Sequence, residues 1–476
     1  MVVAPGWTRR RRPAIVLLAS LVVVRAVLYA AQGVNFILDD WTLEYLRAME
    51  GTWRSVPAGQ DQLHARPGAW VTYTVLHGVV GPHPLVQLVV LTVVNVAVVL
   101  VLYGVLARFL ERPRALLVSA IWAVLPIHQS MGLWSGASPI AVGTLLLLLG
   151  VLALSYGRWL PGGLALAASI LCYELSAPVS LVAGLVVASP LLPLHPDTAP
   201  SPRTLTNGNR AAVLFLVVLA TWWSSTHAIY PIRLRLPNPA AVWSAHFGHG
   251  LFGSVATPLP LVLATGGLAA IGVATCLLAW LRGDRARDGG PTLVLAGLVV
   301  FVLGLGVVFT VHAGALGFND RLYAVSSIGA AMMVTGVGVF AWGHRPAAAL
   351  ALAASLVAVA LVGQFVSVRS WSQAGADVVA LLDHLEAEYP DAAHTNFIVG
   401  PTPRDRNNVS GVVSPHGGAE AAFRLWFPDA DPPCQPAPAP CTGSLVIARS
   451  ADDFVPTERG ETLVRWSEAL DGGDPP

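Results

Sequence analysis

Long apolar stretches separated by short polar segments run along most of the chain. Many of them approach the ~20 residues that an α-helix needs to cross the ~30 Å hydrocarbon core of a bilayer. This pattern predicts an all-α polytopic membrane protein with about eleven membrane helices. They are expected near residues 13–31, 84–107, 115–131, 138–155, 161–174, 177–193, 211–228, 258–281, 292–312, 322–342 and 347–366.

The interval 161–193 leaves two possibilities open. One long helix there would reverse the sidedness of everything that follows, whereas two short helices would keep it. Ser176 and Pro178 are typical of a helix start, because serine caps free N–H groups and proline fits the first helical turn. We therefore favour two short helices.

Composition and charge support a membrane protein and give it an orientation. The chain is 55% hydrophobic and 12% charged, against roughly 25% charged residues in soluble domains. Its net charge of +1 excludes a nucleic-acid partner, which needs a concentrated basic surface. Arginines cluster in alternate loops, and such clusters mark the cytoplasmic side. These clusters are Arg9–Arg12, Arg108 to Arg114, Arg158, Arg203 and Arg210, Arg282 to Arg287, and Arg345. We expect a multi-pass plasma-membrane protein with a cytoplasmic N-terminus and an extracytoplasmic C-terminus.

Two parts of the chain follow from this arrangement. Residues 1–366 form the predicted membrane domain, with large external loops at 32–83 and 229–257. Residues 367–476 have a soluble composition and predict a small external α/β appendage. Its expected elements are a helix from Val368 to Leu385 and strands at 396–400 and 444–448, and an external location would allow Cys434 and Cys441 to form a disulfide.

Two adjacent carboxylates, Asp39 and Asp40, begin a helical pattern in the first external loop. Trp41 and Tyr45 suit a short helix at the membrane interface. One aspartate is explained by helix capping, since its side chain accepts free backbone N–H groups. A second carboxylate beside it raises the pKa of one of the two, which favours a general base or a metal ligand. A divalent metal is therefore left open.

Further charged residues lie near the predicted outer surface. His64 and Arg66 share the first loop with the aspartates, and Pro67 predicts a second short helix there. Arg66 is either an interfacial residue with an apolar stem or a phosphate ligand. Glu174 lies in a short membrane segment, where a carboxylate is costly unless it is functional or paired. Arg25, inside the first predicted span, is a candidate partner for Glu174.

The second external loop contains Arg233, His246 and His249. The two histidines are three residues apart on a predicted helix, and no third ligand is near in sequence. We therefore expect an interfacial helix that holds no metal.

Several motifs resemble those of the GT-C class of membrane glycosyltransferases. LDDW at 38–41 resembles the acidic motif of the first external loop, and ARPG at 65–68 resembles an Arg-Pro-Leu element. LPIHQSMGLW at 125–134, LCYEL at 171–175 and NDRLYAVSSIG at 319–329 resemble three later elements in the same order. In the last of these, an arginine contacts the donor phosphate, which corresponds to Arg321.

The resemblance implies transfer of a sugar from a polyprenyl-phosphate donor to an envelope glycan, lipid or protein outside the cytoplasm. One aspartate of the pair would be the general base, with Asp40 slightly preferred over Asp39. Arg321 and Arg66 would meet the phosphate, and His64, Glu174 and Arg233 would be further substrate-binding residues.

Other functions compete with this interpretation. A lipid-linked glycan polymerase or ligase would centre on Arg233 and His246, and a transporter or a non-catalytic scaffold would need neither site. A cavity shared by the aspartates and Arg321 would favour glycosyl transfer, and one around Arg233 and His246 would favour the ligase.

Overall fold

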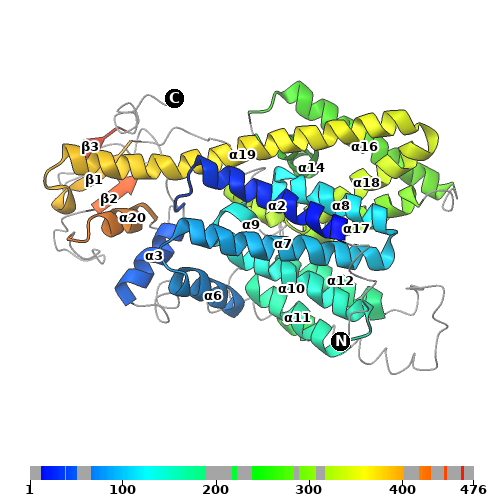
Figure 1. Ribbon diagram of the computed structural model, residues 1–476, viewed down its shortest axis with the longest axis horizontal. Helices are drawn as coiled ribbons and strands as arrows, with labels where there is room; N and C mark the ends of the chain where they lie inside the picture. The colour runs from blue at the N-terminus through cyan, green and yellow to red at the C-terminus, as the bar shows by residue number, and fades with distance from the viewer. Residues whose placement is uncertain are drawn as a thin grey trace.

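A computed structural model gives the architecture of the protein. It describes residues 12–37, 39–50, 66–188, 217–221, 238–254, 256–282, 289–306, 317–400, 418–429, 444–447 and 462–465. Of the candidate site residues and cysteines named above, His64, Arg233, Cys434 and Cys441 lie outside these ranges. So do several of the topology-setting arginines: Arg9–Arg11, Arg203, Arg210, Arg285 and Arg287. The described part is mostly helical, with one small sheet at one end (Figure 1).

Five described helices are long and apolar enough to cross a membrane. They are α2 (Arg12–Gln32), α7 (Pro84–Phe109), α10 (Ser138–Ser155, extended by the turn before it), α16 (Leu259–Leu281) and α19 (Pro346–Glu388). Shorter apolar helices occupy other expected intervals: α8 (Arg112–Val124), α11 (Trp159–Cys172), α12 (Ala177–Ala188), α17 (Gly290–Gly304) and α18 (Ser326–His344). The total of eleven crossings stays a prediction.

The interval 161–193 contains two helices, as favoured from the sequence. Helix α11 ends at Cys172 because Tyr173 is extended, with φ −161° and ψ 130°. A short 3₁₀ turn, η4 (Glu174–Ser176), follows, and α12 starts at Ala177 with Pro178 in its first turn.

The prediction of one helix over residues 115–131 is wrong at the C-terminal end. Helix α8 stops at Val124 because Pro126 lacks an N–H group and holds the residue before it extended. The chain then forms three short pieces, η2 (Pro126–His128), α9 (Ser130–Leu133) and η3 (Ser135–Ala137), before α10 begins. This irregular stretch is buried and lies next to the candidate site.

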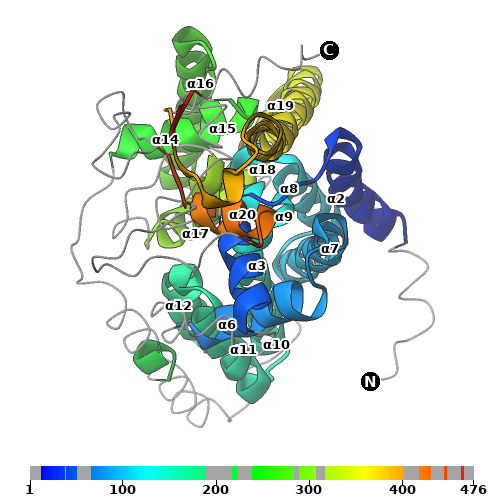
Figure 2. The same ribbon diagram turned by 90° about the vertical axis from the view of Figure 1, so that its left-hand side faces the viewer.

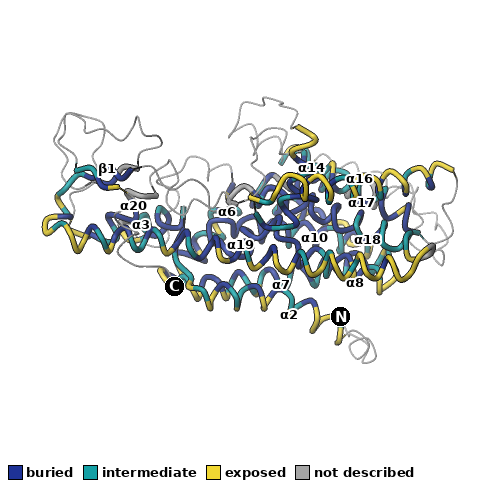
Figure 3. The backbone as a smooth tube through the Cα atoms, turned by 90° about the horizontal axis from the view of Figure 1, so that it is seen from above, coloured by how far each residue is buried: buried dark blue, intermediate teal, exposed yellow. Residues whose placement is uncertain are grey.

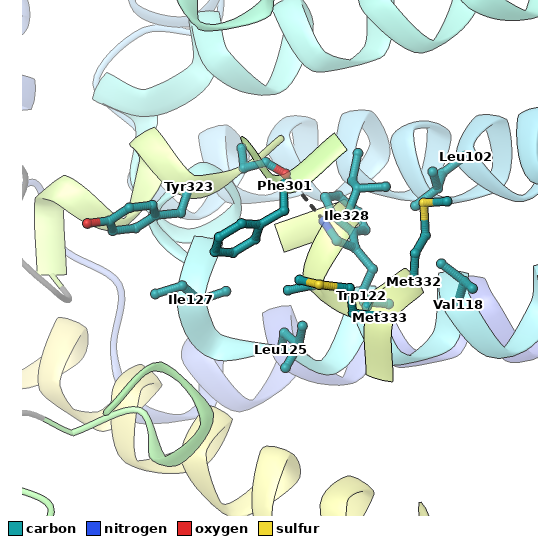
Figure 4. Packing of buried hydrophobic residues seen from close by; sticks show 14 of the residues in the cluster. Leu102, Val118, Trp122, Leu125, Ile127, Phe301, Tyr323, Ile328, Met332 and Met333 are labelled. Carbon is teal, nitrogen blue, oxygen red and sulfur yellow. Dashed lines mark hydrogen bonds between the residues drawn. The ribbon is translucent and has the colours of Figure 1, made fainter. Parts of the chain in front are cut away.

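The interior of the bundle is closely packed around Trp122, Phe301 and Met333 (Figure 4). Glycines let α17 and α18 approach each other: a Cβ on Gly329 would lie 2.3 Å from the backbone nitrogen of Phe301. Small residues at helix contacts are typical of membrane bundles. Large apolar side chains remain exposed along the outer faces of α2, α16 and α19 (Figure 3), as expected where helices face lipid.

Helix α19 is longer than the sequence pattern predicted. It runs unbroken for 43 residues, so the expected boundary between residues 366 and 367 falls inside it. A span near 347–366 and a tail helix from Val368 to Leu385 are therefore one continuous element, which leaves the bundle and enters the appendage (Figure 1).

The appendage contains a three-stranded parallel sheet in the order β2-β1-β3. Strands β1 (Asn396–Val399) and β2 (Ser444–Ile447) confirm the two predicted strands. Strand β3 (Thr462–Val464) and helix α20 (Gly418–Trp426) were not predicted. The shared core of this region includes Leu382, Phe397 and Phe423, together with Phe36 and Trp41 from the first loop. The appendage therefore packs directly on the helix that carries the aspartates (Figure 2).

Candidate functional site

The predicted helix of the first loop is present as α3 (Asp39–Glu50), and its two aspartates have different surroundings. Asp40 is 3% exposed. Its Oδ2 accepts the backbone N–H of Ile37 at 3.3 Å, and its Oδ1 accepts the hydroxyl of Ser135 at 2.5 Å. Asp39 is half-buried. Asp40 therefore attaches the start of α3 to Ser135, whereas the side chain of Asp39 remains partly exposed.

Burial raises the pKa of Asp40 to about 6, although the charge of His77 and the hydrogen bond from Ser135 oppose the rise. The charge of neighbouring Asp39 adds to it. This is the effect expected for two adjacent carboxylates.

Tyr73 joins the second short helix of the first loop to the buried stretch before α10. It ends helix α6 (Pro67–Tyr73), which starts at the predicted Pro67, and its hydroxyl donates to the carbonyl of Gly136 at 2.8 Å. Burial raises the pKa of Tyr73 first, and the charge of Asp39 raises it further, whereas Arg321 and Arg66 oppose the rise. Asp39, Arg66 and Arg321 therefore all lie near enough to Tyr73 for their charges to affect its hydroxyl.

Arg321 lies in the 3₁₀ segment η6 (Gly317–Tyr323), just before α18. It is half-buried, and its Cζ lies 4.8 Å from the ring centroid of Trp134. The neighbouring Asp320 is buried, and its Oδ1 accepts the backbone N–H of Ser130 at 3.1 Å as well as the Ser130 hydroxyl. Burial raises the pKa of Asp320 to about 8, opposed by these bonds and by Arg321 and Arg25.

Arg66 and Glu174 form a buried two-bond ion pair. The Arg66 Nε donates to Oε2 at 2.8 Å, and Nη2 donates to Oε1. The guanidinium also lies 4.3 Å from the ring centroid of Tyr173. The proposed pairing of Glu174 with Arg25 is therefore wrong: Arg25, on α2, interacts with Asp320 instead.

Glu44 is a site-adjacent residue that the sequence did not single out. It follows Asp40 by one helical turn and is buried. Its carboxylate accepts Arg47 Nε at 2.6 Å and Gln87 Nε2 at 3.1 Å, and it lies 2.8 Å from the Nδ1 of His77. Burial would raise the pKa of Glu44, but the His77 and Arg47 contacts outweigh it, and the pKa is lowered.

His77 reaches Glu44 from a π-helix, η1 (Thr74–Val79), a geometry that is frequent at functional sites. The one available signal in the sequence was the spacing of Asp40 and Glu44, which places both on one helix face.

His246 lies on α14 (Pro239–Phe247) and is 2% exposed. Its Nδ1 is 2.9 Å from the carbonyl of Val242, and its Nε2 is 2.9 Å from the hydroxyl of Ser326. Burial lowers the pKa of His246 to about 4. His249 is on the short helix α15 (His249–Phe252). Among the described residues no group of three or more His, Cys, Asp or Glu is arranged to hold a metal.

A cavity of about 80 Å³ lies between α8, α14, α18 and α19. Its lining is apolar apart from His246 and Thr335, and it includes neither the aspartates nor Arg321. This cavity therefore favours neither glycosyl transfer nor the ligase function. It touches His246, but both ring nitrogens of that histidine already have hydrogen-bond partners.

Comparison with known proteins gives a distant similarity in structure only. No protein-family model matches the chain, and no curated protein matches its sequence. The apo oligosaccharyltransferase of Archaeoglobus fulgidus is 13% identical, with a TM-score of 0.43 over 87% of this chain and 63% of that chain. The complex of the same archaeal protein, AglB, with an inhibitory peptide and a dolichol-phosphate is 13% identical, with a TM-score of 0.43 over 83% and 62%. The chain spans less than two thirds of the length of these structures.

Proposed function

We propose that this protein is a membrane glycosyltransferase that moves a sugar from a polyprenyl-phosphate donor to an acceptor outside the cytoplasm. The observation that carries the proposal is that one stretch, Trp134–Ser135, contacts both the start of the aspartate helix and Arg321. Trp134 Nε1 donates to the carbonyl of Ile37 at 3.2 Å, and its ring centroid lies 4.8 Å from the Cζ of Arg321. Ser135 donates to Asp40, the neighbour of Asp39. A partly exposed carboxylate can take a proton from an acceptor hydroxyl, and a partly exposed arginine can bind a phosphate. Both groups are needed for transfer from a phosphate-linked sugar.

The reaction assigns one role to each group. The acceptor oxygen attacks the anomeric carbon while Asp39 takes the proton of the hydroxyl. The bond between that carbon and the phosphate oxygen breaks, and the polyprenyl phosphate leaves with the electron pair. Arg321 meets the negative charge of the leaving phosphate, for which a planar guanidinium is well suited.

We assign the general base to Asp39 and not to Asp40, the reverse of the slight preference drawn from the sequence. Both oxygens of Asp40 accept hydrogen bonds, from Ile37 and from Ser135, and its side chain is buried. Asp40 would therefore hold α3 in place and orient Asp39.

The remaining assignments follow from this one. Arg66 and Glu174 would support the site as a pair, because each satisfies the other. The first loop and the appendage pack together, which supports the same side of the membrane for both, and we assign them to the extracytoplasmic side from the arginine pattern. The N-terminus would then be cytoplasmic, the membrane the plasma membrane, and the acceptor an envelope glycan, lipid or protein.

The test is sugar transfer by Asp39→Asn in membranes supplied with labelled polyprenyl-phosphate sugars. The variant is nearly isosteric, so loss of a general base should lower the rate about 10²–10⁴-fold at matched protein abundance. Asp383→Asn is the control, because Asp383 is an exposed carboxylate on α19. Near-normal transfer by Asp39→Asn would remove Asp39 from the chemistry. Failure of the unmodified protein to use any such donor would remove the proposed function.

A further inference from the structure

Residues Ser130–Ser135, which we call the connecting segment, contact both halves of the candidate site. At the first end, the backbone N–H and the hydroxyl of Ser130 both donate to Asp320. Asp320 is the residue immediately before Arg321, so these bonds attach the arginine-bearing turn η6 to helix α9. The Ser130 end of the segment therefore fixes the backbone from which Arg321 projects.

The other end of the connecting segment holds the aspartate helix. The Nε1 of Trp134 donates to the carbonyl of Ile37 at 3.2 Å, and the hydroxyl of Ser135 donates to Asp40 at 2.5 Å. The ring of Trp134 also lies under the guanidinium of Arg321. The same few residues thus contact the start of α3 and the side chain of Arg321.

The segment itself has little room to move. All six of its residues are buried, and Ser135 is 5% exposed. The amide of Asn95 donates to the carbonyl of Met131 at 3.3 Å. A Cβ on Gly132 would lie 2.4 Å from the Nη2 of Arg25. The segment is therefore held from α7 and from α2.

The hydroxyls of Ser130 and Ser135 bind carboxyl groups and not backbone carbonyls. Ser119, equally buried on α8, donates to the carbonyl of Ala115 in its own helix at 2.8 Å. That is the usual arrangement for a buried helical serine. Ser130 and Ser135 instead donate across the structure to Asp320 and Asp40, 190 and 95 residues away in sequence.

We propose that the connecting segment sets the spacing between the aspartate pair and Arg321, with Ser130 and Ser135 as positioning residues. This inference rests on the proposed function for the roles of Asp39 and Arg321. Ser135 orients Asp40 and through it the start of α3, and Ser130 places η6 and through it Arg321. Neither serine touches the substrate.

The two serines are separated by two measurements. Ser130→Ala should raise the KM for the polyprenyl-phosphate donor about tenfold with little change in kcat, as for loss of one buried hydrogen bond. Ser135→Ala should lower kcat and raise the pH at which the Asp40 carboxyl titrates, because the lost donor had favoured ionised Asp40. The other groups that act on Asp40 are His77 on η1, Tyr29 on α2 and Asp39 on α3, all unchanged in this variant.

The control variant is Ser119→Ala, which removes a buried hydroxyl without touching either carboxylate and should change neither parameter. Ser130→Thr and Ser135→Thr keep a hydroxyl and should restore most of each effect. A structural role alone would lower abundance in the alanine variants and leave KM, kcat and the Asp40 titration as they are, and that result would overturn the inference.

Two readouts without sugar transfer separate this inference from the proposed function. Infrared spectroscopy follows the titration of the Asp40 carboxyl, and direct binding of a polyprenyl monophosphate follows Arg321. If the unmodified protein transfers no sugar but Ser135→Ala moves the titration and Ser130→Ala weakens phosphate binding, the positioning roles stand and the glycosyltransferase proposal fails. Robust transfer with neither readout moved would support the glycosyltransferase proposal and overturn the positioning roles.

Discussion

Arg66 and Arg321 both oppose the rise in the pKa of Tyr73, yet their surroundings differ. Arg66 is buried and donates two hydrogen bonds to Glu174. Arg321 is half-buried and stacks over Trp134. From the sequence both arginines were assigned to the donor phosphate. Their surroundings indicate that a buried arginine with a two-bond carboxylate partner stabilises the fold, whereas an arginine held by an aromatic ring at a partly exposed position can receive a ligand.

The strongest effect is expected for the buried arginine and its partner. Glu174→Leu should destabilise the fold by about 3–5 kcal/mol, because it leaves the Arg66 charge buried without its carboxylate. The double variant with Arg66→Met should recover much of this loss, since well-packed apolar pairs replace buried ion pairs with little cost. Thermal unfolding in detergent measures both. A single variant as stable as the parent, but without donor binding, would make Glu174 a substrate ligand and remove the contrast between the two arginines.

A second, smaller effect is expected for the half-buried arginine. Arg321→Lys keeps the charge but loses the planar pair of donors that suits a phosphate. Donor affinity should fall about tenfold while protein abundance holds. Arg369→Lys is the matched control, because Arg369 is exposed on α19. If Arg321→Lys instead abolishes the accumulation of the protein in membranes, Arg321 has a structural role like that of Arg66.

A third effect, visible only when the pH is varied, concerns the ionisation of Asp40. Its pKa rises from an ordinary 3.8 to about 6 in the fold, first because of burial. The folded state therefore holds this proton more tightly, so the stability it adds is present below pH 3.8 and is lost as the pH rises through about 6. Asp40→Asn should remove this decline from the pH dependence of thermal unfolding. An unchanged decline would assign it to another group, such as Asp320.

The elements of the fold that depend on local pattern were predictable from the sequence. Apolar runs located the membrane helices, Pro67 and the aspartates located two short helices, and Ser176 with Pro178 located the start of α12. The length of α19 was missed because the composition becomes polar after residue 366, although nothing there breaks the helix. A helix such as α19 can pass from an apolar to a polar environment with no change in its backbone conformation.

The contacts that build the site could not be predicted in this way. The Arg66–Glu174 pair joins residues 108 positions apart, and Ser130 meets Asp320 across 190 positions. A hydropathy pattern records which side chains avoid water and not which ones face each other. The stretch after Pro126 was assigned to a helix because its residues are apolar, and its irregular backbone is what brings Ser130 and Ser135 to the two carboxylates.

The continuous helix α19 has a mechanical consequence. At 1.5 Å per residue its 43 residues extend about 65 Å, roughly twice the ~30 Å thickness of a bilayer core. A helix of this kind acts as a rod that sets the height of the appendage above the lipid. Helix α20 packs on α3 at that same end. A change in bilayer thickness that tilts α19 would therefore displace the appendage and, through α20, the aspartate helix α3.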